Sequence, residues 1–234
     1  TFDYAGQDTE TVEIKVNDGK PIENKLIYGS VSGKKVDENG EALAGAVIGI
    51  FKADETEFTA EHAFMTVKSG EDGSFAFKKV PYGNWIVKEI EAPEGFVLDG
   101  TAHAVTIDWN EQVIEAEITN EYIHGNIRLT KVDADYPDNK LTGATFEVYK
   151  DVNGDGKLDD KDELVGNLEE TSVSIYEIQE LLYGKYLVKE TKAPEGFVLD
   201  EGVYSVSITE DEKTYDVENK AGVGFINQAM KGNL

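Results

Sequence analysis

The sequence lacks cysteine altogether, contains only 5 prolines and is poor in basic residues, with 22 Lys and Arg against 47 Asp and Glu. The absence of cysteine excludes disulfide bonds and thiolate metal sites, so the chain must gain its stability by other means. The formal net charge of −25 argues against a nucleic-acid partner, because phosphate binding relies on clustered Lys and Arg. We expect most of the acidic side chains to form a solvated surface.

The sequence also shows no apolar run of membrane length, no signal peptide and no sortase-type anchoring motif. We therefore expect a fragment of a longer protein, with no membrane segment inside it. No nucleophile elbow, P-loop or dinucleotide fingerprint is present, and the three histidines lie far apart in sequence. These absences argue against an enzyme.

Short segments of alternating apolar and polar residues run along the chain, separated by turn signals such as DENG, EDG and PYGN. This pattern is typical of strands, and several short strands in roughly 100 residues predict a β-sandwich. Hydrophobic residues make up 40% of the chain, enough to fill such cores. Residues 174–184, SIYEIQELLYG, are the one segment where we expect a helical turn.

Three internal repeats divide the chain. VKEIEAPEGFVLDG begins at Val87 and VKETKAPEGFVLDE at Val188, an offset of 101 residues, and a second pair of similar segments begins at Gly29 and Gly125. An Asn followed five residues later by Gly recurs at Asn24, Asn120 and Asn227 and marks the unit junctions. We predict one domain over residues 25–121 and another over 122–234. Residues 1–24 are either the tail of a preceding unit or an extra pairing strand.

Each unit carries a Lys, a Glu and an Asn in the same order. The lysine lies in the opening strand, the glutamate in the VKE strand and the asparagine at the end of the last strand. The period-2 alternation of these strands points all three side chains inward, and Lys34, beside the first lysine, outward. Three buried polar groups are costly unless they meet. The sets are Lys35, Glu89 and Asn120 in the first unit, and Lys131, Glu190 and Asn227 in the second.

If these groups meet, a reaction becomes available. Desolvation favours a neutral, nucleophilic lysine amine and a protonated glutamic acid that can polarise the asparagine carbonyl. Attack on the asparagine side chain would expel ammonia and leave an amide cross-link, assisted by the fixed positions of the groups. The glutamates would act once, in maturation, so the chain is predicted not to be a turnover enzyme.

The segments KVDENGEALAGA with WIVKEIEAPEGF, and KVDADYPDNKLTGA with YLVKETKAPEGF, closely resemble the collagen-adhesin B-type (Cna-B, SpaA-like) domains of Gram-positive adhesins and pilins. The resemblance implies tandem prealbumin-like or Ig-like β-sandwiches in an all-β chain. It also implies isopeptide bonds Lys35–Asn120, with Glu89, and Lys131–Asn227, with Glu190. Asn219 is a rival partner in the second unit, and the shared junction spacing favours Asn227.

The second unit also contains DVNGDGKLDDKDE, which follows the spacing of a calcium-binding loop of the EF-hand type. Position twelve holds Asp where Glu is usual, and the flanking segments are strands, so we predict a calcium-stapled strand connection without a sensor-like opening. The first unit lacks the pattern. The candidate Ca²⁺ ligands are Asp151, Asn153, Asp155, the Lys157 carbonyl, Asp159 and Asp162.

Together these features predict a structural stalk or spacer segment of a cell-surface adhesin or pilus protein. We expect it to be extracellular and attached to the cell wall through parts outside this sequence, with neighbouring repeats of the same protein as partners. The alternative hypothesis is an adhesin module whose loops bind a host matrix protein or glycan.

Overall fold

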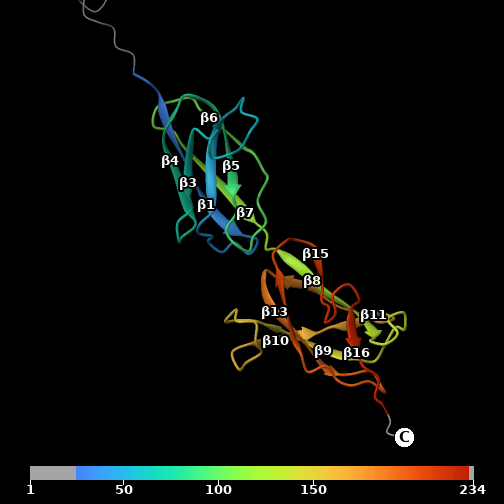
Figure 1. Cartoon of the computed structure of the whole chain (residues 1–234). Coiled ribbons are helices and arrows are strands. Elements are labelled where there is room, and N and C mark those ends of the chain that lie inside the picture. Colours follow the sequence, from blue (N-terminus) through green and yellow to red (C-terminus); the bar gives the residue numbers. More distant parts are fainter. Residues whose placement is uncertain (1–24, 232–234) are drawn as a thin grey trace, which may run out of the picture.

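The computed structural model describes residues 25–231, which form two β-sandwiches in tandem (Figure 1). The predicted role of residues 1–24 lies outside the described part. All the regular elements are strands, as the alternating pattern predicts. The first sandwich contains β1 (Tyr28–Asp37), β2 (Val47–Lys52), β3 (Met65–Lys68), β4 (Ser74–Pro81), β5 (Gly83–Glu91), β6 (His103–Ile107) and β7 (Val113–Asn120). The second contains β8 (His124–Asp133), β9 (Thr145–Lys150), β10 (Glu163–Asn167), β11 (Glu169–Ser172), β12 (Ile175–Leu182), β13 (Gly184–Lys192), β14 (Val203–Ile208), β15 (Lys213–Asp216) and β16 (Phe225–Asn227).

The first sandwich packs a three-stranded sheet, in the order β4-β1-β7, against a four-stranded sheet, in the order β3-β2-β5-β6. Its first and last strands, β1 and β7, are parallel neighbours in the smaller sheet. The alternating side chains of both sheets form one apolar core that includes Val31, Ile50, Phe77, Trp85 and Ile118. Burial of each such side chain contributes about 1.5–3 kcal/mol, which holds the two sheets face to face.

The second sandwich repeats this plan, with β8 in the place of β1 and β13 in the place of β5. Its last strand is divided: β15 and β16 both pair parallel to β8, one after the other along that strand. Residues 217–224 form an excursion between the two pieces. The first and last strands are therefore parallel neighbours in both sandwiches.

The helical turn expected in residues 174–184 is wrong, because this segment is strand β12, antiparallel to β8. A β-bulge between Ile178 and Leu181, with Glu180 at φ 57°, inserts an extra residue. The bulge places two inward apolar residues three positions apart, which is helical spacing. Lys79 in β4 adopts the same backbone conformation, with φ 57°.

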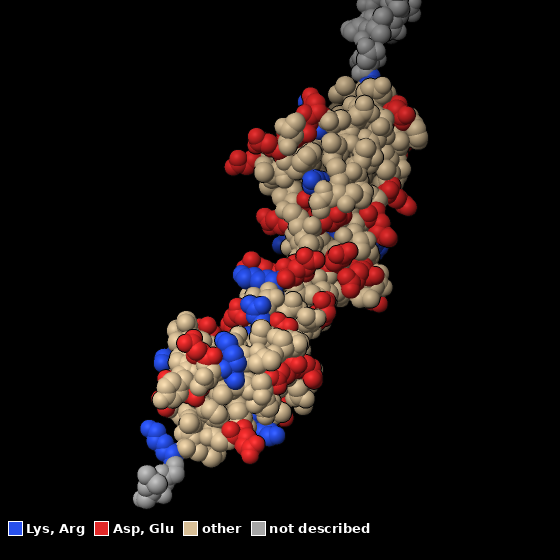
Figure 2. Space-filling view, turned by 90° about the vertical axis from the view of Figure 1, so that its right-hand side faces the viewer, with Lys and Arg blue, Asp and Glu red and all other residues tan. Residues whose placement is uncertain are grey.

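The described residues, 25–231, include no helix long and apolar enough to cross a membrane. On the face seen in Figure 2, acidic side chains are distributed over both sandwiches and basic ones are fewer. This distribution agrees with a solvated acidic surface.

Candidate functional site

Lys35 and Lys131 lie inside the two sandwiches. Lys35 follows the inward parity of Val31 on β1, and Lys131 follows that of Leu129 on β8; both lysines are 0% exposed. Lys34, one residue earlier, is outside and contacts Asp72 at 3.4 Å. The alternation of a strand therefore selects one lysine of the KK pair for the core.

In the first sandwich, Glu89 reaches the lysine from the opposite sheet. Glu89 lies on β5, and its Oε1 is 3.7 Å from Lys35 Nζ. Its Oε2 accepts a hydrogen bond from Asn120 Nδ2, at the end of β7, at 2.7 Å. Lys35 Nζ also donates to the Ile118 carbonyl at 3.0 Å. The structure thus brings the three predicted residues together, with one glutamate oxygen facing each partner.

The second sandwich repeats the arrangement. Glu190 Oε1 is 3.3 Å from Lys131 Nζ, and its Oε2 accepts from Asn227 Nδ2 at 2.8 Å. Lys131 Nζ donates to the carbonyl of Phe225 at 3.3 Å and lies 4.6 Å from the centre of the Phe225 ring. The amine of the second lysine therefore lies over two aromatic rings, those of Phe225 and Phe146.

Burial shifts the pKa of both lysines toward the neutral amine. Desolvation lowers the pKa of Lys35, opposed by the charge of Glu89. Desolvation lowers the pKa of Lys131 to about 8, opposed in the same way by Glu190. A lower pKa raises the fraction of neutral amine near neutral pH, and the neutral amine is the nucleophilic form.

Four buried atoms at these two sites have no hydrogen-bond partner among the described residues: Oε1 of Glu89 and Glu190, and Oδ1 of Asn120 and Asn227. A buried polar atom without a partner costs about 1–3 kcal/mol. Each glutamate Oε1 still faces its lysine amine as an ion pair, whereas Oδ1 of the asparagine has no partner in either sandwich. This repeated cost indicates that the arrangement serves something other than the stability of the separate side chains.

One expectation needs correction. The glutamate faces the amide nitrogen of the asparagine, and the asparagine carbonyl oxygen has no partner to polarise it. The physical reason is a main-chain acceptor: the carbonyls of Val97 and Val198 accept from Asn120 Nδ2 and Asn227 Nδ2. Because a main-chain carbonyl can only accept a hydrogen bond, the amide nitrogen of the asparagine, and not its oxygen, must point toward it.

Sequence reasoning missed a further contact to each glutamate. The backbone N–H of Asp99 donates to Glu89 Oε2, and that of Asp200 donates to Glu190 Oε2, both at 2.8 Å. The signal was present, since both aspartates end the repeated segment GFVLD. The loop after each APEG turn therefore folds back to hold the glutamate.

Asn219, the rival partner in the second unit, has a different position. Its Oδ1 accepts from Ile226 N, and its Nδ2 donates to the Ile226 carbonyl and to Asp200. It closes the excursion between β15 and β16. Asn227, and not Asn219, contacts Glu190.

The predicted calcium loop connects β9 to β10. These two strands flank the loop, as the sequence predicts, and pair antiparallel. Asp151 is buried, and its two carboxylate oxygens accept from Gly154 N at 2.7 Å and Gly156 N at 3.1 Å. Asn153 Nδ2 donates to Asp159 at 3.1 Å across the loop. Asp162 closes the loop by accepting from Val152 N and Asp159 N.

Among residues 25–231, no group of three or more His, Cys, Asp or Glu side chains is gathered as a metal site. The predicted ligand set draws instead on mixed donors, since it includes the Asn153 amide and the Lys157 main-chain carbonyl with the four carboxylates. All of these are the hard oxygen donors that Ca²⁺ prefers. The loop offers the donor atoms that calcium prefers, and Asp162 closes it by hydrogen bonds to its other end. Its carboxylates, however, are spread along the loop and are not gathered around one point.

The comparisons with known proteins agree with the architecture. The family model described as SpaA, prealbumin-like fold domain, matches residues 29–122 and 125–221. The Bacillus anthracis TIE protein has a similar structure, with a TM-score of 0.69 and 26% identity over 87% of this chain and 34% of that one. This chain therefore spans about a third of that protein.

Two pilins are more distant. A streptococcal ancillary pilin matches with a TM-score of 0.41 and 23% identity, over 87% of this chain and 63% of that chain. The minor pilin of Streptococcus agalactiae matches with a TM-score of 0.37 and 19% identity, over 88% and 98%. No significant match was found among curated protein sequences. The two matched segments cover most of the sequence, and the chain belongs to the family of SpaA prealbumin-like fold domains, of which it carries two copies in tandem.

Proposed function

We propose that this chain is a spacer that carries tension in a bacterial surface protein, and that each sandwich is closed by an isopeptide bond between its first and last strands. The observation that carries the proposal is the buried Lys–Glu–Asn set, repeated in both sandwiches with the same contacts. We further infer an extracellular, wall-attached location, with neighbouring repeats of the same protein as partners. Membership of the SpaA domain family supports this reading.

The geometry supports a single condensation at each site. The neutral amine of Lys131 attacks Cγ of Asn227, forming the new C–N bond and placing negative charge on Oδ1. Glu190 Oε1, 3.3 Å from the amine, takes a proton from it. Glu190 Oε2, 2.8 Å from Asn227 Nδ2, lies where a proton can be given to that nitrogen, which then leaves as ammonia. Lys35, Glu89 and Asn120 have the same roles in the first sandwich.

Each bond would shield most of its sandwich from tension. Residues 35 and 120 are 85 positions apart, and residues 131 and 227 are 96 apart. Force entering through β1 would cross to the end of β7 without passing through β2 to β6. An uncross-linked first sandwich would instead release roughly 300 Å of chain when pulled open, at about 3.5 Å per residue.

We propose that calcium binding to the loop of residues 151–162 adds a second restraint. When bound, the ion would draw the four carboxylates of the loop together, offset their charge and tie β9 to β10. Asp151, Asn153, Asp155, Asp159 and Asp162 would hold it with their side chains, and Lys157 with its main-chain carbonyl.

Single-molecule pulling of the whole chain between its two ends tests the spacer function. The expected force trace of the wild-type chain shows no step in which a whole sandwich unfolds. The Glu89→Ala and Glu190→Ala variants should each gain one such step. A wild-type chain that unfolds in two full-length steps is not a cross-linked spacer. The alternative, an adhesin module for a host matrix protein or glycan, predicts binding in glycan-array or matrix-protein assays with the same chain.

A further inference from the structure

One contact between the two sandwiches joins a turn of the first to a turn of the second. Tyr183, between β12 and β13, donates its hydroxyl hydrogen to Glu94 Oε1 at 2.6 Å. Its ring lies against Gly95, where an added Cβ would come within 3.5 Å of the ring. Gly95 has φ +88°, a conformation that glycine adopts without strain. The Glu94–Gly95 turn of the first unit thus packs against the Tyr183–Gly184 turn of the second.

Main-chain hydrogen bonds extend this contact through the junction. Ile123 N donates to the Gly95 carbonyl at 2.9 Å, and the Ile123 carbonyl accepts from Tyr183 N at 2.9 Å. The same residue is therefore bonded to the first sandwich on one side and to the second on the other. Such bonding fixes the direction in which the second sandwich leaves the first.

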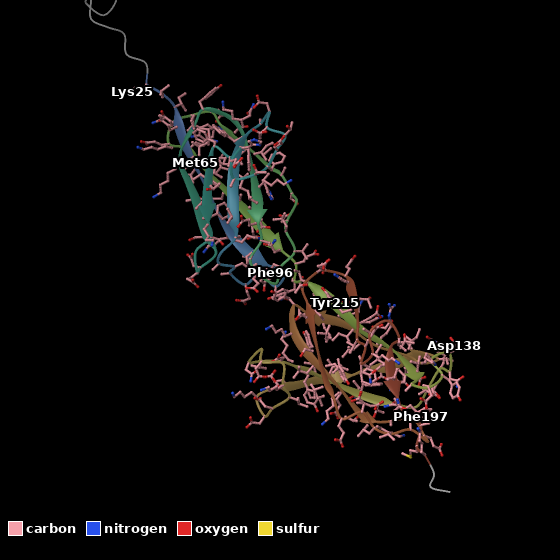
Figure 3. All side chains as sticks on the ribbon, viewed as in Figure 1. Lys25, Met65, Phe96, Asp138, Phe197 and Tyr215 are labelled. Atoms are coloured by element: carbon pink, nitrogen blue, oxygen red, sulfur yellow. The ribbon has the colours of Figure 1, made fainter. Side chains whose placement is uncertain are left out.

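Each free end of the described chain carries one half of the same contact. At the first sandwich, Tyr82 N donates to the Ile27 carbonyl at 3.0 Å, as Tyr183 N does to Ile123, and the Tyr82 side chain is 64% exposed. At the second, Met230 N donates to the Gly196 carbonyl at 2.8 Å, as Ile123 N does to Gly95. Figure 3 shows Phe96, next to Gly95, at the junction, and Phe197, next to Gly196, near the opposite end of the second sandwich.

The two glycines differ only in what covers them. Gly196 has φ +85°, close to that of Gly95, but a Cβ added there would meet no atom of residues 25–231 within 4 Å. The turn of residues 195–196 is thus folded like its occupied counterpart and is exposed. A fully formed half of a contact, without its other half, points to a partner that carries the other half.

We propose that the Glu195–Gly196 turn and Tyr82 are docking surfaces for further sandwiches of this same kind, joined in the chain at the Asn-x4-Gly junction. Glu195 and Gly196 would receive the tyrosine of a following unit, and Tyr82 would lie on the Glu–Gly turn of a preceding one. A tyrosine side chain buries only about 150–250 Å², whereas a stable contact between separate molecules needs about 1,000 Å² of buried surface. A covalent junction raises the effective concentration to the millimolar range, where one tyrosine can set the orientation.

The chemistry of the contact explains the choice of tyrosine. Glu38, Glu121, Glu180, Asp211 and Glu212 line the cleft beside the joint, so the facing surfaces repel each other. A phenol hydroxyl donates to Glu94 without adding charge, and its ring covers the glycine. These docking surfaces rest on the proposed partnership with neighbouring repeats, and they do not depend on the isopeptide bonds.

The test extends the chain at its own junction. Residues 1–231 are followed by a second copy that begins at Gly29, which keeps the Asn-x4-Gly spacing after Asn227. Only the first copy is isotope-labelled. An aromatic ring over a glycine shifts its Hα signals, so Gly95 provides the reference shift. We expect Gly196 of the first copy to move from its shift in the unextended chain to that of Gly95.

Two variants complete the experiment. Tyr82→Ala in the second copy should return Gly196 of the first copy to its original shift. Tyr82→Ala in the first copy, which lies outside the new joint, should leave that shift unchanged and serves as the matched control. A Gly196 signal that stays in place in a folded, extended chain overturns the proposal, as does a Gly95 signal that is unaffected by Tyr183→Ala.

Discussion

Asn120 lies two residues beyond Ile118, the register partner of Lys35 on the parallel strand β7, so Lys35 and Asn120 are diagonal neighbours on one face of the sheet. Asn227 has the same relation to Lys131 through Phe225 on β16. Because the strands are parallel, tension at the two ends of a sandwich shears them past each other. A bond between these two residues lies directly in the path of that tension.

Removing Asn120 should measure the contribution of closure in the first sandwich. Asn120→Ala leaves the Lys35–Glu89 pair in place but prevents the bond. By analogy with disulfide loops, we expect the free energy of unfolding to fall by about 4–5 kcal/mol. Trp85, 4% exposed in that core, reports the unfolding by fluorescence in guanidinium. As a control, Lys34→Ala, at an exposed lysine, should leave the guanidinium concentration at the unfolding midpoint unchanged. Equal midpoints for Asn120→Ala and the wild type would contradict the covalent closure of the first sandwich.

The buried lysine predicts an unusual dependence of stability on pH. In Asn227→Ala, Lys131 stays free, with its pKa lowered from 10.5 to about 8 by burial. Between these values the unfolded chain binds more protons than the folded one, so stability rises with pH across this window, by up to about 3 kcal/mol. NMR signals of the second sandwich, followed during denaturation, measure the effect. The double variant Lys131→Met, Asn227→Ala should lack this rise, and an identical rise in it would refute the assignment.

Asn219 and Asn227 should respond differently to substitution. Asn219→Ala removes three hydrogen bonds that hold the excursion between β15 and β16, so we expect a loss of about 1–3 kcal/mol with the cross-link intact. Asn227→Ala should instead abolish the bond in the second sandwich. Tryptic peptide mapping shows which variant keeps the branched peptide that contains Lys131. A branched peptide that persists in Asn227→Ala would assign the bond to another residue.

Calcium should stabilise the second sandwich only. At a free concentration about 100 times the dissociation constant, binding adds about 2.7 kcal/mol to the free energy of unfolding. Asp151→Asn should remove this gain, since Asp151 is the buried carboxylate of the loop. Asp160→Asn makes the same change of charge at an exposed position outside the predicted ligand set and should keep it. Calorimetric titration with calcium measures the affinity of each variant. Equal calcium binding by Asp151→Asn and Asp160→Asn would contradict the assignment of Asp151 as a calcium ligand.

Much of the site could be predicted from the sequence, because a strand fixes which side its residues face. The alternation of the strand predicts that Lys35 points inward and Lys34 outward. The internal repeats single out Glu89 and Glu190 as equivalent residues, and likewise the two last-strand asparagines. The APEGF segments and the junction spacing were enough to divide the chain into two units, in agreement with the matched family segments.

The rest depended on contacts between distant segments. The orientation of the asparagine amides is set by the Val97 and Val198 carbonyls, which come from loops. The bulge at Glu180 places apolar residues of β12 three positions apart, so the sequence predicts a helical turn where the structure has a strand. The Tyr183–Glu94 contact joins two units, and no pattern within one unit indicates it.

The intact mass of the purified wild-type chain tests the covalent closure most directly. Each condensation expels one ammonia of about 17 Da, so two bonds predict a mass about 34 Da below that of the unmodified sequence. Lys131→Ala should retain one of the two losses. A wild-type chain with the full mass of its sequence would contradict the account, because the two buried lysines would then face their asparagines without reacting.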